Sequence, residues 1–388
     1  MKNVVLRAPL LSKSGYGVHS RQVFKYLLTK PHLNVRTQIV PWGITPWGVA
    51  DDSFESLAPE ILSRTDDGSS NTKYDISLQV QLPHEWDASI ANFNIGVTAG
   101  VETDKCSPVW TSVHCSKMDL VIVPSAHTKK TLENSGVTTT PIVVVPESYF
   151  AQLTQKPEPL DLELKTNFNF LAVGVLTGMT PATDRKNMFY LIKWFIEEFR
   201  NDRDVGLILK TNRGRETSID KSLTEGIIRK VLHELQHEGT PRVYLMHGDM
   251  SRKEMNSLYR HPKIKALVSP TRGEGFGLPL LEAAVAELPV IATGWSAHTE
   301  FLNKGKWLSV DFSLEDVHPT RIDNTIFVPG SKWAEVSELS FKKTLRKFRK
   351  SSSVPKKWAT NLSKILSEEY SEKSVFKKYE EVLGEILN

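Results

Sequence analysis

Two glutamates, Glu274 and Glu282, flank a glycine-containing segment at residues 275–277, and their spacing suggests a particular kind of binding site. The apolar run at residues 266–270 is typical of a buried parallel strand, and Pro279 stands where the first turn of a helix tolerates proline. A strand, a glycine loop and a helix start let the backbone approach a ligand and offer N–H groups to an anion. Two carboxylates would repel phosphate but would accept hydrogen bonds from hydroxyl groups. The expected ligand has phosphates in its middle and hydroxylated rings at both ends, as a nucleotide sugar does.

The string from Glu274 to Ala283 resembles the Glu-x7-Glu element of retaining glycosyltransferases with the GT-B architecture, most closely those of glycosyltransferase family 4. The resemblance implies that Glu274 holds the sugar and takes part in catalysis, and that Glu282 holds the ribose. It implies a donor site that includes Glu274, Gly275, Phe276, Gly277, Leu278 and Glu282. The alternative is an ordinary α/β loop followed by a helix with a capping glutamate. The complete string, between a strand and a helix, favours the functional interpretation.

Two cations, Arg185 and Lys186, stand at the expected start of a helix, where positive charge opposes the helix dipole unless an anion is bound. The segment resembles the family's basic pair that neutralises the donor diphosphate, and Lys186 is the closer match. Relatives usually carry another arginine directly after the glycine of the preceding strand, but here Val175 follows Gly174. Arg185 is therefore expected to substitute for it. Lys210, at the end of the next predicted strand, is a weaker candidate, and a solvated helix start is the structural alternative.

The first predicted strand is followed by the loop that contains Gly15, Tyr16 and Gly17. In the resembling family this loop lies near the reacting sugar and the leaving phosphate, so these residues are expected to contribute to the donor site. Many relatives carry a histidine near the anomeric centre, and at the matching strand end this chain offers Glu102, a catalytic candidate. A tight strand-to-helix turn is the alternative interpretation of the glycines. Trp42 could stack on a sugar or base, or pack in the core.

Strand-like and helix-like segments alternate along the chain, which is typical of doubly wound parallel sheets. Strands are predicted at 3–6, 35–40, 75–80, 94–98, 119–124, 142–146, 168–176, 205–211, 242–247 and 289–293. Helices are predicted at 21–28, 187–200, 222–237 and near the C-terminus, and residues 50–72 are expected to form a surface excursion.

These elements predict an α/β protein of the GT-B type, with two Rossmann-like doubly wound domains that face a central cleft. The first, on the acceptor side, is expected at residues 1–150, and residues 151–165 are expected to form a linker. The nucleotide-sugar-binding domain is expected at residues 166–371. The family resemblance implies that a last helix at 372–388 crosses back to the first domain.

The composition is that of an ordinary globular protein, with 388 residues, 40% of them hydrophobic, and a net charge of +4. No apolar run approaches the roughly 20 residues of a membrane span, and no signal-peptide pattern is present. The two cysteines are too few for a disulfide framework and lack the spacing of metal ligands. We expect a cytoplasmic protein without a cofactor and without a catalytic metal.

The predicted function is retaining transfer of a hexosyl or pentosyl group from a nucleotide diphosphate sugar to a hydroxyl of a glycan or polysaccharide. Lys186 and Arg185 would stabilise the leaving diphosphate. One alternative is a DNA glycosyltransferase acting on hydroxymethylated bases, because residues 341–358 carry eight lysines and arginines without an acidic residue. More often such a run is a solvated helix face. The same architecture would also suit a phosphorylase-like enzyme with pyridoxal phosphate, or a non-catalytic nucleotide-sugar-binding module.

Overall fold

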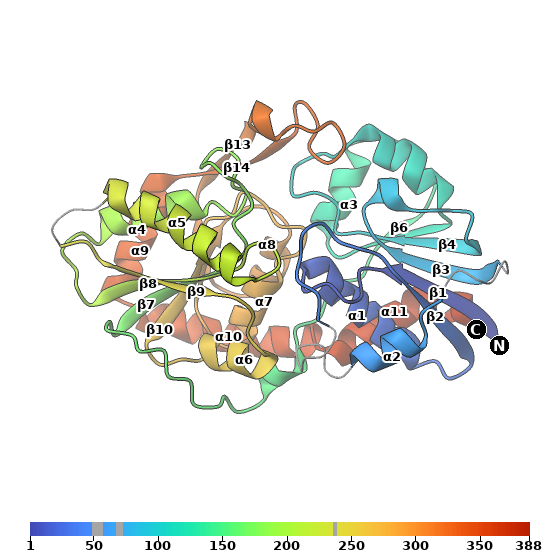
Figure 1. Cartoon of the computed structure of the whole chain (residues 1–388), viewed down its shortest axis with the longest axis horizontal. Coiled ribbons are helices and arrows are strands. Elements are labelled where there is room, and N and C mark those ends of the chain that lie inside the picture. The colour runs from blue at the N-terminus through green and yellow to red at the C-terminus, as the bar shows by residue number, and fades with distance from the viewer. Residues whose placement is uncertain (49–56, 67–72, 236–238) are drawn as a thin grey trace. The chain divides into compact units, whose positions relative to one another are not determined.

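The computed structural model describes residues 1–48, 57–66, 73–235 and 239–388, and it divides the chain into two compact units (Figure 1). The first unit comprises Met1–Ser148, Asp323–Ser331 and Tyr370–Asn388, and the second comprises Tyr149–Ile322 and Lys332–Glu369. Asp323–Ser331 thus belongs to the first unit, although the sequence-based division placed it in the second domain. A long-range packing choice of this kind leaves no signal in the local pattern of residues.

The first unit is built on a six-stranded parallel sheet with the order β2-β1-β3-β4-β5-β6. Its strands are β1 (Lys2–Ala8), β2 (Leu33–Ile39), β3 (Tyr74–Val80), β4 (Ala91–Val97), β5 (Leu120–Val123) and β6 (Ile142–Val144). Its helices are α1 (Gly15–Leu28), α2 (Leu57–Ser63), α3 (Ala126–Glu133), α11 (Glu372–Leu387) and the short turns Pro83–Glu85, Trp110–His114 and Cys115–Lys117. The expected excursion at residues 50–72 lies partly outside the described residues, and its described part contains α2.

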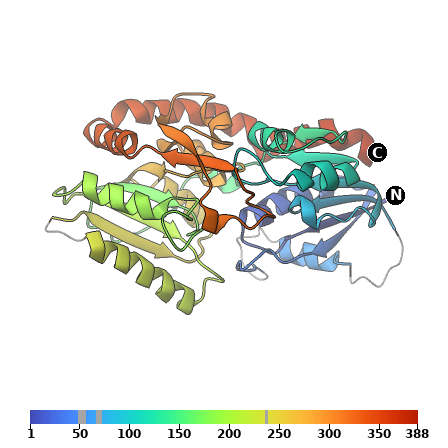
Figure 2. The same ribbon diagram turned by 90° about the horizontal axis from the view of Figure 1, so that it is seen from above.

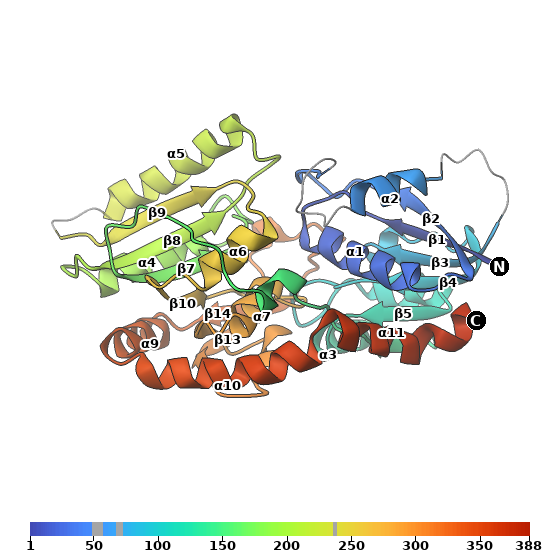
Figure 3. The ribbon, with the colours of Figure 1, turned by 90° about the horizontal axis from the view of Figure 1, so that it is seen from below.

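Helix α11 lies beside α1 within the first unit, as Figure 3 shows. Val375, Tyr379, Leu383 and Leu387 recur every three or four residues and are fully buried in the same hydrophobic core as the β1 side chains. This spacing places them on one face of the helix. An ion pair between Lys25 and Glu372, 2.9 Å long, links the two helices at their polar edge.

The second unit contains another six-stranded parallel sheet, with the order β12-β11-β10-β7-β8-β9. Its strands are β7 (Phe168–Val173), β8 (Val205–Thr211), β9 (Arg242–His247), β10 (Ile264–Ser269), β11 (Val290–Thr293) and β12 (Leu308–Val310). Its helices are α4 (Met188–Glu198), α5 (Ser218–Leu235), α6 (Arg252–Tyr259), α7 (Leu278–Val285), α8 (His298–Leu302), α9 (Glu338–Lys350), α10 (Ser353–Glu369) and the short turns Ala151–Thr154 and Pro319–Arg321. An antiparallel hairpin, β13 (Phe312–Asp316) and β14 (Lys332–Val336), is orange in Figure 2.

Several predicted boundaries in the second unit are corrected by the structure. The strand predicted at residues 168–176 ends at Val173, and the helix predicted at 187–200 is shorter at both ends. The helix predicted at 222–237 already begins at Ser218, and residues 236 and 237 lie outside the described part. Local propensity blurs such ends because capping contacts decide them.

The order of strands in the second unit creates a switch point between β7 and β10. Strand β7 has β8 on one side and β10 on the other, so the segments that follow β7 and β10 leave the sheet next to each other. In open parallel sheets, ligands bind outside the carboxyl ends of the strands at such a point. The loop with Glu274 follows β10 and the segment with Lys186 follows β7, so the topology brings both candidates to this edge.

Candidate functional site

Glu274 forms a buried ion-pair cluster with the two cations predicted to bind phosphate. Lys186 Nζ lies 2.7 Å from Glu274 Oε1 and 2.8 Å from Oε2. Arg185 Nη1 lies 3.5 Å from Glu274 Oε2 and donates a 2.6 Å hydrogen bond to the carbonyl of Gly273. The side chains of all three charged residues are at most 14% exposed. The structure therefore unites three of the predicted site residues within one unit.

The two neighbouring cations keep Glu274 ionised despite its burial. Burial alone would raise the pKa of this carboxyl, because a low-dielectric surrounding disfavours charge. The charges of Lys186 and Arg185 outweigh burial and lower the pKa to about 2. With Glu274 ionised, the cluster joins one carboxylate to two cationic side chains.

The segment that carries Arg185 and Lys186 precedes α4 instead of opening it. The helix begins at Met188, and its backbone N–H donates a 2.6 Å hydrogen bond to Asp184 Oδ2. Asp184, which is fully buried, therefore supplies the anion expected at this helix start. Asp184 was not foreseen in this role, because it stands three residues before the N-cap Asn187. Arg185 and Lys186 therefore lie before the first turn of α4, whereas the sequence had placed them at the helix start.

Helix α7 presents a different start. Its N-cap is Gly277, with φ of 99°, and glycine has no side chain with which to cap the helix. Pro279 lacks an N–H, so it needs no partner there. A Cβ added at Gly277 would lie 3.0 Å from His298 Cβ and 3.6 Å from Glu274 Cγ. Glycine is therefore required both by the backbone angle and by the close packing of the glutamate loop.

The neighbours of Gly277 in the sequence have distinct surroundings. The ring of Phe276 is buried and packs against Phe301, with 5.6 Å between centroids. Gly275 is buried and Leu278 is half-buried. The short loop thus anchors one hydrophobic side chain in the core.

Glu282 lies one turn into α7 in surroundings unlike those of Glu274. Tyr259 donates a 3.0 Å hydrogen bond to Glu282 Oε2, and Arg252 Nη1 lies 3.8 Å from Oε1. Burial raises the pKa of Glu282 to about 7, since Arg252 and Tyr259 compensate only in part. Both partners lie on α6 and were not foreseen, because only the folded arrangement brings that helix to α7.

Lys210 lies at the end of β8 and is buried. Its ammonium group donates to the carbonyl of Gly248 and lies 3.3 Å from Asn212 Oδ1. The structure thus connects it with the loop after β9. This arrangement gives Lys210 a role in holding two strand ends together.

The first unit contains its own cluster of predicted residues around Tyr16. The Tyr16 hydroxyl lies 3.0 Å from Thr98 Oγ1 and accepts a 3.0 Å hydrogen bond from the backbone N–H of Ala99, beyond the end of β4. Burial raises the pKa of this phenol. The Tyr16 ring stacks on Trp42 with 4.0 Å between centroids. Half-buried Glu102 belongs to the same strand-end segment as Ala99 and adds a repulsive charge that also raises the pKa of Tyr16.

Gly15, Tyr16 and Gly17 form the first turn of α1, not a loop before it. Ser14 caps this turn, since its Oγ accepts a 3.1 Å hydrogen bond from Gly17 N. A Cβ at Gly17 would lie 1.9 Å from the carbonyl oxygen of Ser12, whereas Gly15 faces open space. Gly17 is therefore explained by the turn itself, and only Gly15 leaves room for a ligand.

Some of the lysines and arginines of residues 341–358, here called the basic tract, form ion pairs inside the second unit. Lys342 pairs with Glu197 and Glu338, Arg346 pairs with Glu198, and Arg349 pairs with Asp202 and Asp204. Three exposed lysines remain on one face of α9 without an acidic partner among the described residues, and these are Lys343, Lys347 and Lys350. Three of the eight basic residues thus join α9 to α4 and to the segment that follows α4.

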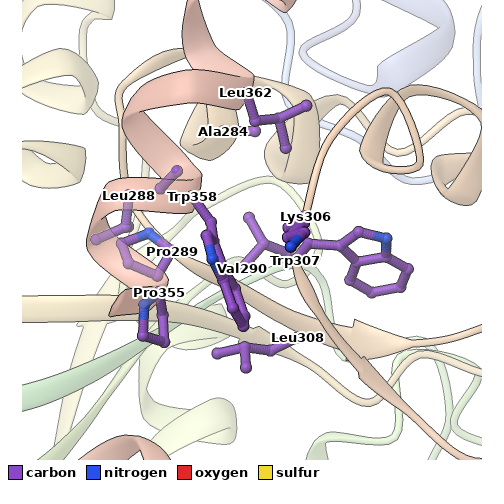
Figure 4. Close-up of a pocket in the computed structure, with 11 residues that line it drawn as sticks. Ala284, Leu288, Pro289, Val290, Lys306, Trp307, Leu308, Pro355, Trp358 and Leu362 are labelled. Carbon is purple, nitrogen blue, oxygen red and sulfur yellow. The ribbon is translucent and has the colours of Figure 1, made fainter. Parts of the chain in front are cut away.

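An apolar hollow lies at the far end of α7 and contains none of the predicted site residues. It is formed by the end of α7, the strands β11 and β12, and α10 (Figure 4). Trp358 and Lys306 face it, with Lys306 Nζ 6.0 Å from the Trp358 ring centroid. Because the hollow adjoins the amino ends of the strands, it is separate from the carboxyl-end site of Glu274.

None of the helices in the part of the chain that the structure describes is long and apolar enough to span a membrane.

Residues 229–317 match a family model described as glycosyl transferases group 1. This segment contains Glu274 and Glu282 together with Arg252 and Tyr259. A sucrose synthase of Melioribacter roseus is 25% identical over 179 residues, which cover 42% of this chain and 21% of that protein. A sucrose synthase of Solanum tuberosum is 26% identical with the same coverage. The chain thus spans about a fifth of the length of these curated relatives.

Several solved structures resemble the entire chain. HepE of Anabaena, solved with UDP and glucose, has a TM-score of 0.66 and 13% identity, over 99% of this chain and 100% of HepE. Sucrose-phosphate synthase of Thermosynechococcus elongatus has a TM-score of 0.64 and 12% identity, over 100% of this chain and 99% of that one. These likenesses show that the chain has the GT-B fold, with two Rossmann-like domains. The group 1 match and the GT-B fold together support sugar transfer.

Proposed function

We propose that this protein is a retaining glycosyltransferase that transfers a hexosyl or pentosyl group from a nucleotide diphosphate sugar to a hydroxyl of a glycan or polysaccharide. The observation that carries the proposal is the buried cluster of Glu274, Lys186 and Arg185 at the switch point of the second sheet. It places a carboxylate, which can accept hydrogen bonds from sugar hydroxyls, and two cations beside the start of α7, whose N-cap is a glycine. This combination matches the chemistry of a sugar linked to a diphosphate.

In the proposed complex, the diphosphate binds Lys186, Arg185 and the backbone at the start of α7. Glu274 accepts hydrogen bonds from the sugar hydroxyls, and Glu282 accepts them from the ribose. The backbone of Gly275, Phe276, Gly277 and Leu278 would complete this part of the donor site, and Gly15 and Tyr16 remain our donor-site candidates in the first unit. These assignments follow the family resemblance and the surroundings of each residue.

The reaction breaks the bond between the anomeric carbon and the diphosphate oxygen and forms a bond to the acceptor hydroxyl on the same face. The acceptor proton passes to the departing diphosphate, whose growing negative charge is stabilised by Lys186 and Arg185. Glu102 of the first unit remains our candidate for the role of the family's histidine. These side chains supply the charge that the step needs, and the proposal uses neither a metal nor a cofactor.

UDP-glucose is the first donor to test, because HepE was solved with UDP-glucose as well as with UDP and glucose. Thermal-shift measurements with UDP-, GDP- and ADP-sugars should show stabilisation by one base. A ligand at 100 times its Kd adds about 2.7 kcal/mol to the folded state. The activity is then tested by measuring sugar transfer to glycan acceptors. The anomeric configuration of the product shows whether the transfer is retaining. Binding without turnover would point to a non-catalytic module.

The exposed lysines of α9 keep a DNA acceptor with hydroxymethylated bases as a second candidate. Both candidates use the same donor site and differ only in the acceptor. The two buried, free cysteines accord with the cytoplasmic location that we propose for this enzyme.

A further inference from the structure

The backbone of Glu274 is held on both sides by the short connection between β11 and α8. The N–H of Glu274 donates a 2.9 Å hydrogen bond to Ser296 Oγ. The carbonyl of Glu274 accepts a 3.3 Å hydrogen bond from the N–H of Ala297. The backbone N–H and carbonyl of Glu274 are therefore both held by two consecutive residues, Ser296 and Ala297. We call this connection between β11 and α8 the strap.

The Ser296 hydroxyl is itself oriented by His298, which is fully buried. His298 Nε2 lies 2.7 Å from the carbonyl oxygen of Thr293, so it carries a hydrogen and donates it. Burial lowers the pKa of His298, although Glu274 opposes this, and the ring is therefore neutral at pH 7. Nδ1 is then an acceptor, 3.3 Å from Ser296 Oγ. The Ser296 proton points to His298, and its lone pairs face the Glu274 N–H.

Two features show that the strap has a demanding geometry. Ser296 has φ of 83°, a backbone conformation that residues other than glycine rarely adopt. The side chain of His298 closes against Gly277, where an added Cβ would lie only 3.0 Å from His298 Cβ. A glycine at position 296 would relieve the backbone but would remove the hydroxyl. The chain thus keeps a hydroxyl where the backbone favours glycine.

We propose that Ser296 and His298 are positioning residues for sugar transfer, which act by setting the place of the Glu274 carboxylate. The inference rests on the proposed function and extends it to residues outside the Glu-x7-Glu string. A misplacement of about 1 Å in a catalytic group lowers the rate by up to about 100-fold. Loss of the strap contacts should lower kcat and leave the contact between Glu282 and the nucleotide intact.

Three variants separate positioning from a general contribution to stability. Ser296→Ala keeps the strained backbone and removes the hydroxyl, whereas Ser296→Gly removes the strain as well. Both should lower kcat by about 10–100-fold, with UDP affinity changed less than about threefold, and Ser296→Gly should be the more stable of the two. His298→Asn, which retains an acceptor near Nδ1, should recover part of the activity that His298→Leu loses. Ser222→Ala and His233→Leu, both on the exposed face of α5, are the matched controls.

A double-mutant cycle with Glu274→Gln provides the decisive measurement. If Ser296 acts through Glu274, adding Ser296→Ala to Glu274→Gln should cause little further loss of kcat. Fully additive losses, or normal kcat in both Ser296 variants of an active enzyme, would overturn the inference while the proposed function stands. Wild-type protein that neither binds nor turns over any nucleotide sugar would overturn the proposed function, and this inference with it.

Discussion

Glu274 and Lys186 are 88 positions apart in the sequence, yet the Lys186 ammonium group contacts both oxygens of the Glu274 carboxylate at 2.7 and 2.8 Å. The contact exists because β7 and β10 are neighbours in the sheet. It joins a residue expected to bind sugar to one expected to bind phosphate. In the proposed complex, the diphosphate lies beside a lysine that already has an anionic partner. The ligand would therefore either displace the Glu274 carboxylate from Lys186 or bind next to the intact pair.

Lys186→Ala should reduce the affinity for nucleoside diphosphates much more than for the nucleoside, because only the diphosphate presents charge to this position. Removing one partner of a buried ion pair costs roughly 3–5 kcal/mol of stability, and Arg185 should keep the loss near the lower end. Calorimetry with both ligands and urea unfolding check the two effects. Lys253→Ala, at an exposed ion pair, is the control. An equal loss of affinity for nucleoside and diphosphate would assign Lys186 to folding alone.

Glu282→Ala should weaken nucleotide binding, whereas Glu274→Ala should lower turnover and leave nucleotide affinity nearly normal. The reason is the separate placement of the two carboxylates, one in the loop and one in the helix. Loss of a hydrogen bond to a charged group typically costs about 1.5–3 kcal/mol. Titration calorimetry and initial-rate kinetics measure the two quantities. Unchanged nucleotide affinity in Glu282→Ala would remove its assignment to the ribose.

The two glutamates should affect the pH dependence of stability with opposite signs. The pKa of Glu274 is lowered to about 2, so its stabilising contribution is present above the unfolded value of 4.5 and is lost as pH falls toward 2. The pKa of Glu282 is raised to about 7, so its contribution is present below 4.5 and is lost as pH rises through 7.

Urea unfolding of wild type and Glu282→Gln between pH 4.5 and 8 tests the second sign. Wild type should lose stability relative to the variant over this range, by an amount on the order of 3 kcal/mol. Parallel curves for the two proteins would show that burial does not raise the pKa of Glu282.

A glycan acceptor predicts that the exposed lysines of α9 are dispensable for transfer. The triple variant Lys343→Ala, Lys347→Ala, Lys350→Ala should keep wild-type turnover on a glycan, because these side chains do not contribute to the donor cluster. The protein should bind duplex DNA weakly. It should transfer no sugar to hydroxymethylated DNA. Binding that falls steeply with salt, together with sugar on hydroxymethylated but not on plain duplex, would instead favour the DNA acceptor.

Local patterns in the sequence were sufficient to predict the fold class, and they singled out the string from Glu274 to Ala283 as the candidate donor motif. Apolar β-rich runs that alternate with helical stretches predicted parallel sheets, and the comparisons confirm the GT-B fold. Glu274 could be singled out because glycine loops and carboxylates leave a local signature in strand–loop–helix segments. The roles assigned to individual residues remain predictions. Glu274, Lys186 and Arg185 could nevertheless be named as candidate site residues from the sequence alone.

The surroundings of each glutamate, by contrast, are set by the packing of distant segments. Nothing in the sequence near Glu282 indicates Tyr259 or Arg252, and nothing near Glu274 indicates Ser296, because each pair is joined by packing between separate strands and helices. The opposite shifts in the pKa values of the two glutamates arise from these surroundings. Charge, burial and hydrogen-bond direction depend on neighbours in space, and for Glu274 and Glu282 the chain assembles those neighbours only when it folds.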